Sequence, residues 1–254
     1  MTVTTSRDGH VAIVSFARPP VNFADLTMIA AIGAAFDAAD ADRDVRAIVL
    51  RSEGRVFCAG ADLVNANPVA DGVTAERNPF YVAAARLFAV KTPVVCAVQG
   101  SAVGAGLGLS LVADFRVGTP DARFVANFVQ IGFHPGFGIS AVLERVIGRQ
   151  RANLMCLTGR RIRGDEAAAW GLLDALVAPD ALDSGALALA QEIAAGAPLA
   201  VRSTRATMRG DLYALVTAQT DHELAEQAWL QQTADFAEGV RAVAERRPGR
   251  FSGE

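Results

Sequence analysis

Short apolar runs alternate with polar, glycine-rich and proline-rich stretches in the first two-thirds of the chain. The runs at 10–16, 47–50, 94–98 and 115–118 have the length of buried strands, and several are rich in β-branched residues. Between them, the segments 27–39, 80–90 and 104–113 repeat apolar residues at helical spacing. Strands that alternate with helices in this way are typical of an α/β fold. The pattern therefore predicts an α/β core.

The last third of the chain changes to a mainly helical pattern. Glycines and prolines separate the helical stretches that we expect at 152–157, 165–170, 181–195, 199–208 and 212–245. The polar segment 64–78, which contains proline and glycine, is expected to form a loop. We interpret residues 1–196 as a core that carries the site, and residues 197–254 as a C-terminal helical region.

Composition narrows the classes of function. The chain has 254 residues, of which 52% are hydrophobic, and its net charge is only −3. No basic excess points to nucleic acid as a partner. No uncharged apolar stretch reaches the ~18 residues of a membrane span, and no signal-peptide pattern opens the chain. The three cysteines are far apart without a CxxC pair, which predicts free buried thiols, no metal site and a cytoplasmic location.

Two segments of small residues follow predicted strands, FCAGADL at 57–63 and QGSAVGAGLG at 99–108. Small residues let a ligand approach the backbone, and unpaired N–H groups at a helix start can stabilise an oxyanion. Each segment alone is equally explained by close packing of strand and helix. A dinucleotide site is disfavoured, because Leu109 takes the third glycine position of GxGxxG after Gly104 and Gly106.

Together, these segments resemble the enoyl-CoA hydratase/isomerase (crotonase) family. Further matches, in the order of the family, are RPPVN at 18–22, IGFHPGFG at 131–138, LTGRRIRGDEAAAWGLLDALV at 157–177 and EGVRAVAERRPGRF at 238–251. The resemblance implies a spiral of repeated β-β-α units, followed by C-terminal helices that assemble trimers or dimers of trimers. It also implies an acyl-CoA thioester as ligand and no cofactor beyond the coenzyme A of that substrate.

The resemblance also assigns residues to the site. The backbone N–H groups of Ala61 and Ala105 correspond to the oxyanion hole of the family. Residues near adenine, pantetheine or the acyl group would be Val21, Phe23, Ala59, Ala61, Asp62, Leu63, Tyr81, Gly104, Ala105 and Phe128. A C-terminal tail that meets coenzyme A, in some members from a neighbouring subunit, corresponds to Arg247, Arg250 and Phe251. Less specific candidates in or after the variable loop are Asp71, Glu76, Arg77 and Asn78.

The sequence departs from the family at the catalytic carboxylates. Gly108 and Phe128 stand where hydratases of the family carry two glutamates, and Gly136 stands near a carboxylate position of related isomerases. Neither glycine nor phenylalanine transfers protons. His134, in the neighbouring turn, is the candidate substitute, although a role in bracing the turn explains it as well.

Two functional interpretations follow. The first is an acyl-CoA enzyme that stabilises an enolate but does not carry out simple hydration; isomerisation, retro-Claisen cleavage or thioester hydrolysis would each use an oxyanion hole. The second is a non-catalytic acyl-CoA binding or carrier protein. A nicotinamide-dependent oxidoreductase is a third class, which Leu109 disfavours.

Overall fold

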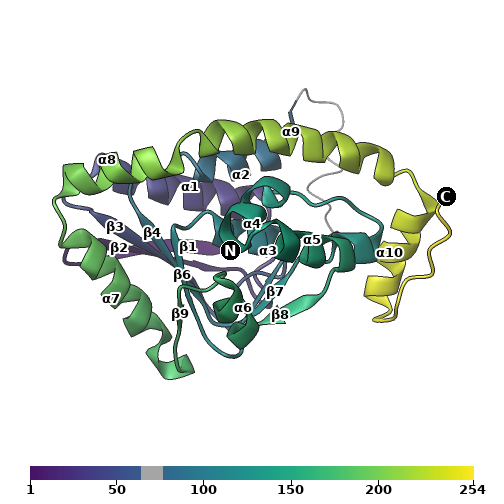
Figure 1. The fold of residues 1–254 in the computed structure, drawn as a ribbon, viewed down its shortest axis with the longest axis horizontal. Helices are drawn as coiled ribbons and strands as arrows, with labels where there is room; N and C mark the ends of the chain where they lie inside the picture. The colour runs from purple at the N-terminus through teal and green to yellow at the C-terminus, as the bar shows by residue number, and fades with distance from the viewer. Residues whose placement is uncertain (64–76) are drawn as a thin grey trace.

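The computed structural model describes residues 1–63 and 77–254, and Figure 1 shows them as strands and helices in a mixed arrangement. The α/β class predicted from the apolar pattern is confirmed. The loop predicted at 64–78 falls almost wholly outside the described residues, and the candidates Asp71 and Glu76 lie outside them too.

Six strands form the main sheet in the order β1-β2-β3-β4-β6-β9, over Thr2–Asp8, Val11–Ala17, Ala47–Ser52, Val94–Val98, Phe115–Gly118 and Ala175–Leu176. All neighbouring pairs are parallel except β1 with β2. The apolar pattern does not predict β1, because nearly all of its residues are exposed. Antiparallel pairing with β2, across the turn at Gly9 and His10, holds this edge strand in place.

Three short strands, β5 (Ser101–Val103), β7 (Arg123–Val125) and β8 (Arg161–Arg163), form a second sheet in the order β5-β7-β8. The chain enters the main sheet, then the second sheet, then a helix. This order occurs in β4, β5 and α3 (Ala105–Leu111), and again in β6, β7 and α4 (Ile139–Ile147). These are the β-β-α units that the resemblance implies.

Helices bury both faces of the main sheet. On one face, α7 (Leu182–Ala194) packs on alternate strand residues such as Val49 and Val95. The opposite face, with Ile48 and Leu50, packs on the larger core that includes α1 (Leu26–Ala41). Parallel strands buried on both faces read as continuous apolar runs, which is the pattern seen at 47–50 and 94–98. The other elements of this part are α2 (Pro79–Leu87), η2 (Phe128–Ile131), α5 (Arg149–Thr158), α6 (Gly164–Trp170) and η3 (Pro179–Ala181).

Three helices complete the chain, α8 (Pro198–Arg209), α9 (Leu212–Leu230) and α10 (Ala234–Ala244). The single helical stretch expected at 212–245 is therefore wrong, since it breaks after Leu230. Thr233 accepts a hydrogen bond from the N–H of Phe236 at 3.1 Å and caps α10. After the break, α10 runs in a different direction from α9 (Figure 1). It packs against η2, and Phe236 packs on Phe133, just after η2, with ring centroids 4.9 Å apart. The division at residue 196 stays a prediction.

The expectations on thiols and membranes have mixed outcomes. All three cysteines are free; Cys58 and Cys96 are buried, whereas Cys156 is only half-buried, because it lines a cavity. No single described helix is both long and apolar enough to cross a bilayer. The pair α7 and α8, taken from Pro179 to Arg209, meets the length and composition test, but it is bent by 104°. The cytoplasmic location stays a prediction.

Candidate active site

The two small-residue segments lie directly against each other. Cys58 pairs with the second segment, and its carbonyl accepts a hydrogen bond from the N–H of Val103 at 3.0 Å. A Cβ at Gly106 would lie 2.2 Å from the Cys58 oxygen, and one at Gly60 would lie 2.8 Å from the Val103 oxygen. Gly60 also has a φ of +92°, which favours glycine. The glycines therefore serve close packing, and that packing brings the two loops together.

Ala61 and Ala105 line one cavity of about 170 Å³ where the loops meet. Ala105 is the first residue of α3, so its N–H has no acceptor within the helix. In the part of the chain that the structure describes, neither alanine N–H donates to a backbone carbonyl. Both groups are thus available to a ligand oxygen.

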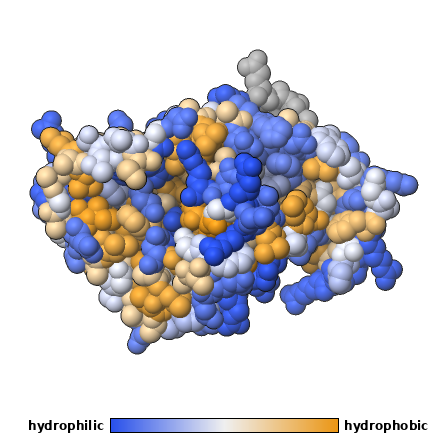
Figure 2. All heavy atoms as spheres, in the orientation of Figure 1, coloured by the Kyte–Doolittle hydropathy of each residue, from blue (hydrophilic) through white to orange (hydrophobic). Residues whose placement is uncertain are grey.

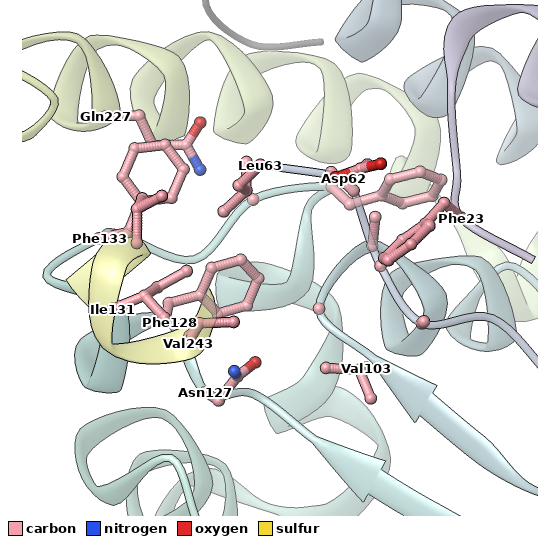
Figure 3. Close-up of a pocket in the computed structure, with 18 of the residues that line it drawn as sticks. Phe23, Asp62, Leu63, Val103, Asn127, Phe128, Ile131, Phe133, Gln227 and Val243 are labelled. Carbon is pink, nitrogen blue, oxygen red and sulfur yellow. The ribbon is translucent and has the colours of Figure 1, made fainter. Parts of the chain in front are cut away.

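The rest of the cavity wall is mainly apolar, as Figure 3 shows. Aromatic rings come from α2, η2 and the turn before α4, and α10 closes one side with two valines. The larger apolar side chains in the wall are Phe23, Leu63, Phe80, Val103, Phe128, Ile131, Phe133, Phe137, Val240 and Val243. Such a surface suits the hydrocarbon part of a ligand.

Aromatic side chains lie against or occupy the positions that the resemblance assigns to catalytic carboxylates. A Cβ at Gly108 would lie 2.6 Å from Cδ1 of Phe137, whose backbone has a φ of +64°. A Cβ at Gly136 would lie 2.1 Å from the Tyr81 hydroxyl. At the remaining position, the Phe128 ring itself stands in the wall. A side chain at position 108 or 136 would therefore meet Phe137 or Tyr81.

Two polar side chains of the wall bind each other. The Tyr81 hydroxyl donates to Oε1 of Gln227 at 2.6 Å, and Nε2 of Gln227 donates to the carbonyls of His134 and Pro135 at 2.9 and 3.3 Å. Burial raises the pKa of Tyr81, so its phenol stays protonated at neutral pH. Gln227 was not predicted, because its place within the long amphipathic segment carries no local signal of a site.

Most of the predicted site residues come together around this cavity. Those that line it are Phe23, Ala59, Ala61, Asp62, Leu63, Tyr81, Gly104, Ala105 and Phe128. Val21 is adjacent, since its carbonyl accepts a hydrogen bond from the N–H of Ala59 at 3.1 Å. Arg77 and Asn78 lie beside Tyr81 in a separate small pocket.

His134 is not brought into the cavity. Its side chain lines a second cavity of about 640 Å³ between α4, α5, α9 and the C-terminal residues. The ring Nδ1 donates to the Pro135 carbonyl at 2.8 Å, and the ring faces His222 at a centroid distance of 6.0 Å. Among the hydrogen bonds of the described residues, His134 reaches the first cavity through its backbone carbonyl, which accepts from Gln227. The geometry therefore gives no support to direct proton transfer by this imidazole.

The predicted C-terminal contacts also lie elsewhere within this chain. Arg247 is hydrogen-bonded to Glu238 and Glu245, and the N–H of Arg250 donates to Glu238 at 2.9 Å. Phe251 is 44% exposed. None of the three lines the cavity of Ala61 and Ala105, so contact with coenzyme A by this tail stays a prediction.

A buried carboxyl supports the turn that carries Phe137. Glu223 of α9 accepts hydrogen bonds from the N–H of Gly138 at 2.7 Å and from the N–H and hydroxyl of Ser140. These donors lie at the start of α4, so the side chain caps that helix from outside. Burial raises the pKa of Glu223 from 4.5 to about 7, and the hydrogen bonds from Ser140 and Gly138 oppose this only in part.

We expect the pH dependence of stability to reflect Glu223. A carboxyl with a raised folded-state pKa stabilises the protein fully below pH 4.5, and this contribution is lost as pH rises from 4.5 to about 7. This pKa shift corresponds to about 3 kcal/mol in the free energy of unfolding. The free energy of unfolding, measured with denaturant, should differ less between pH 5 and pH 8 for Glu223→Gln than for the wild type. Glu226→Gln, on the same helix, is the control; equal pH dependence in E223Q and wild type would contradict the assignment.

Comparison with known proteins gives a match to one family over nearly the whole chain. Residues 6–254 match the family model described as enoyl-CoA hydratase/isomerase. The chain is 33% identical to 1,2-epoxyphenylacetyl-CoA isomerase of Escherichia coli, over 84% of this chain and 83% of that protein. It is 32% identical to (E)-benzylidenesuccinyl-CoA hydratase of Thauera aromatica, over 100% of both.

A solved structure gives the same result for the fold. The enoyl-CoA hydratase/isomerase of Pseudoalteromonas atlantica superposes with a TM-score of 0.88 at 29% identity, over 99% of this chain and 100% of that one. Motifs, fold and relatives agree, and this chain belongs to the enoyl-CoA hydratase/isomerase family.

Proposed function

We propose that the cavity binds an acyl-CoA thioester and that the N–H groups of Ala61 and Ala105 hold its carbonyl oxygen. The observation that carries this proposal is that Ala61 and Ala105 line the same apolar cavity, and that neither N–H has a backbone acceptor among the described residues. Donors fixed in such a place stabilise the negative charge that develops on the oxygen of an enolate. The aromatic wall then accommodates the acyl group.

The reaction that fits this site is one other than simple hydration. A polarised thioester supports isomerisation, carbon–carbon cleavage or hydrolysis, whereas hydration also needs acid–base groups at the positions of Gly108 and Phe128. Of the two relatives named above, one is an isomerase and one a hydratase. Family membership therefore does not select the reaction.

Thermal unfolding tests the binding step. Acyl-CoA thioesters should raise the melting temperature, because a ligand at 100 times its Kd stabilises a native protein by about 2.7 kcal/mol. Free coenzyme A and the free fatty acid are the controls, because each contains only one part of the thioester. No response to any acyl-CoA in a panel of chain lengths would count against the proposal.

A non-catalytic carrier is the second candidate; it is supported by the aromatic rings of Phe128 and Phe137 at or against the positions that the resemblance assigns to the hydratase carboxylates. Turnover of the same acyl-CoA panel separates the two candidates. Tight binding without any turnover favours the carrier. Product formation from any thioester favours the enzyme.

We also propose that the chain assembles as a trimer or a dimer of trimers. The helix α8 has no buried residue, and its large apolar side chains Leu199 and Met208 are each 82% exposed. Trp229 of α9 is 56% exposed as well. Figure 2 shows further apolar areas on the surface over α7. Apolar surface of this extent is typical of a protein–protein interface.

Sedimentation should therefore give a species of three or six chains at micromolar concentration. Replacement of Leu199 and Met208 by Glu should shift it toward smaller species, because two charges would then have to be buried at the interface. A wild-type species of 26.6 kDa, the mass of one chain, would contradict the assembly.

A further inference from the structure

The cavity wall offers a ligand few polar side chains. Those in the described part of the chain are Asp62, Tyr81, Asn127 and Gln227. Tyr81 and Gln227 are bound to each other, and the Gln227 amide is also bound to two carbonyls. Asp62 has a partner of its own and lies on the side of Phe23 (Figure 3). Asn127 differs from them, because among the described residues its amide has no hydrogen-bond partner.

The backbone places Asn127 next to the second loop. It follows β7, whose last residue, Val125, accepts a hydrogen bond from the N–H of Gly104 at 2.9 Å. The Asn127 carbonyl accepts from the N–H of Gln130 at 3.0 Å, but its side chain does not cap η2. In Figure 3 the amide lies between the side chains of Phe128 and Val103. Its backbone therefore lies two residues beyond the hydrogen bond that joins β7 to Gly104, the residue that precedes Ala105.

A half-buried amide in an apolar wall binds a polar group more favourably than a hydrocarbon. A carboxamide has two N–H donors and one acceptor oxygen, so it suits a carbonyl or hydroxyl oxygen. A hydrocarbon in the same place would take the amide out of water without replacing its hydrogen bonds. We propose that Asn127 binds an oxygen substituent of the acyl group close to the thioester. The preferred ligands are then oxygen-substituted acyl-CoAs rather than plain saturated ones.

This inference rests on the proposed function and adds the substrate class. Asn127 acts by binding and orientation, since a carboxamide does not exchange protons as a general acid or base. It was not singled out from the sequence, where it is one polar residue between Ala126 and Phe128. Only the position of its amide in the folded cavity points to a role.

Binding isotherms with three ligands of equal chain length test the inference: butyryl-CoA, 3-hydroxybutyryl-CoA and acetoacetyl-CoA. Wild-type protein should bind one or both oxygenated ligands about three- to tenfold more tightly, the contribution of one hydrogen bond. Comparison of the two oxygenated ligands distinguishes a hydroxyl from a carbonyl. Asn127→Leu should lose this preference, because leucine offers no hydrogen-bonding group to the ligand oxygen. Asn127→Ala serves as a second variant, and Asn153→Leu on α5, outside this cavity, is the matched control.

The outcomes separate this inference from the proposed function. Equal wild-type affinity for all three thioesters would overturn the role of Asn127 and leave acyl-CoA binding intact. A preference that survives in both N127L and N127A would overturn it as well. Failure of all three thioesters to bind would overturn the proposed function together with this inference.

Discussion

Crotonyl-CoA is expected to be hydrated very slowly or not at all by this protein. The proposed oxyanion hole can polarise the thioester, but water addition also needs a base for the water and an acid for the α-carbon. Such groups contribute roughly 10²–10⁴-fold each. Neither Gly108 nor Phe128 supplies one, and His134 lines another cavity.

The loss of the enoyl absorbance measures this reaction directly. A hydratase of the family that carries both glutamates is the positive control, and buffer alone gives the background rate. Turnover at the rate of that hydratase would show that another group of this chain transfers the protons, or that Gly108 and Phe128 do not stand at the carboxylate positions.

The packing around Gly108 also predicts that introducing a glutamate at this position will not restore hydration. In Gly108→Glu, the first carbon of the new side chain would lie 2.6 Å from the Phe137 ring, so the ring would have to move. We expect this variant to melt at a lower temperature than the wild type and to gain no hydratase activity. Phe137→Ala in the same chain should recover part of the lost stability, because it frees the space beside residue 108.

The second large effect is expected from Ala105→Pro. Proline has no N–H, yet the first position of a helix tolerates it, and Ala105 is the first residue of α3. The change therefore removes one oxyanion donor and leaves the helix in place. Loss of one such donor costs roughly 10²–10³-fold in stabilisation of the oxyanion. This corresponds to about two to three pKa units for a bound enolate.

Acetoacetyl-CoA provides the measurement, because its enolate absorbs in the ultraviolet and forms without a catalytic base. A pH titration of the bound ligand should show a lower pKa with wild-type protein than in free solution, and most of this difference should disappear in A105P. Ala234→Pro is the matched control, since Ala234 is the first residue of α10 and does not line the cavity. An enolate pKa that is the same in A105P and wild type would exclude the Ala105 N–H from the oxyanion hole.

Local patterns predicted the strands that are strongly apolar. The strand at 94–98 agrees with β4 residue for residue, because both of its faces are buried and every position is apolar. The three strands of the second sheet did not show in the pattern. Each has three residues, and their pairing partners lie on distant parts of the chain. Segments this short are defined by tertiary pairing rather than by their own periodicity.

Some features of the candidate site were also visible in the sequence, whereas others depend on tertiary packing. Small residues at Gly60 and Gly106 are visible in the sequence, because close approach of two backbones leaves no room for a side chain. The sequence by itself therefore determined the family, the two loops and the absence of glutamates at 108 and 128. It did not show that Phe137 and Tyr81 lie against Gly108 and Gly136, or that His134 lines another cavity. Nor did it show that the Asn127 amide lines the cavity without a hydrogen-bond partner among the described residues. Only the tertiary structure decided these points, because each depends on contacts between segments whose side-chain directions are set by packing.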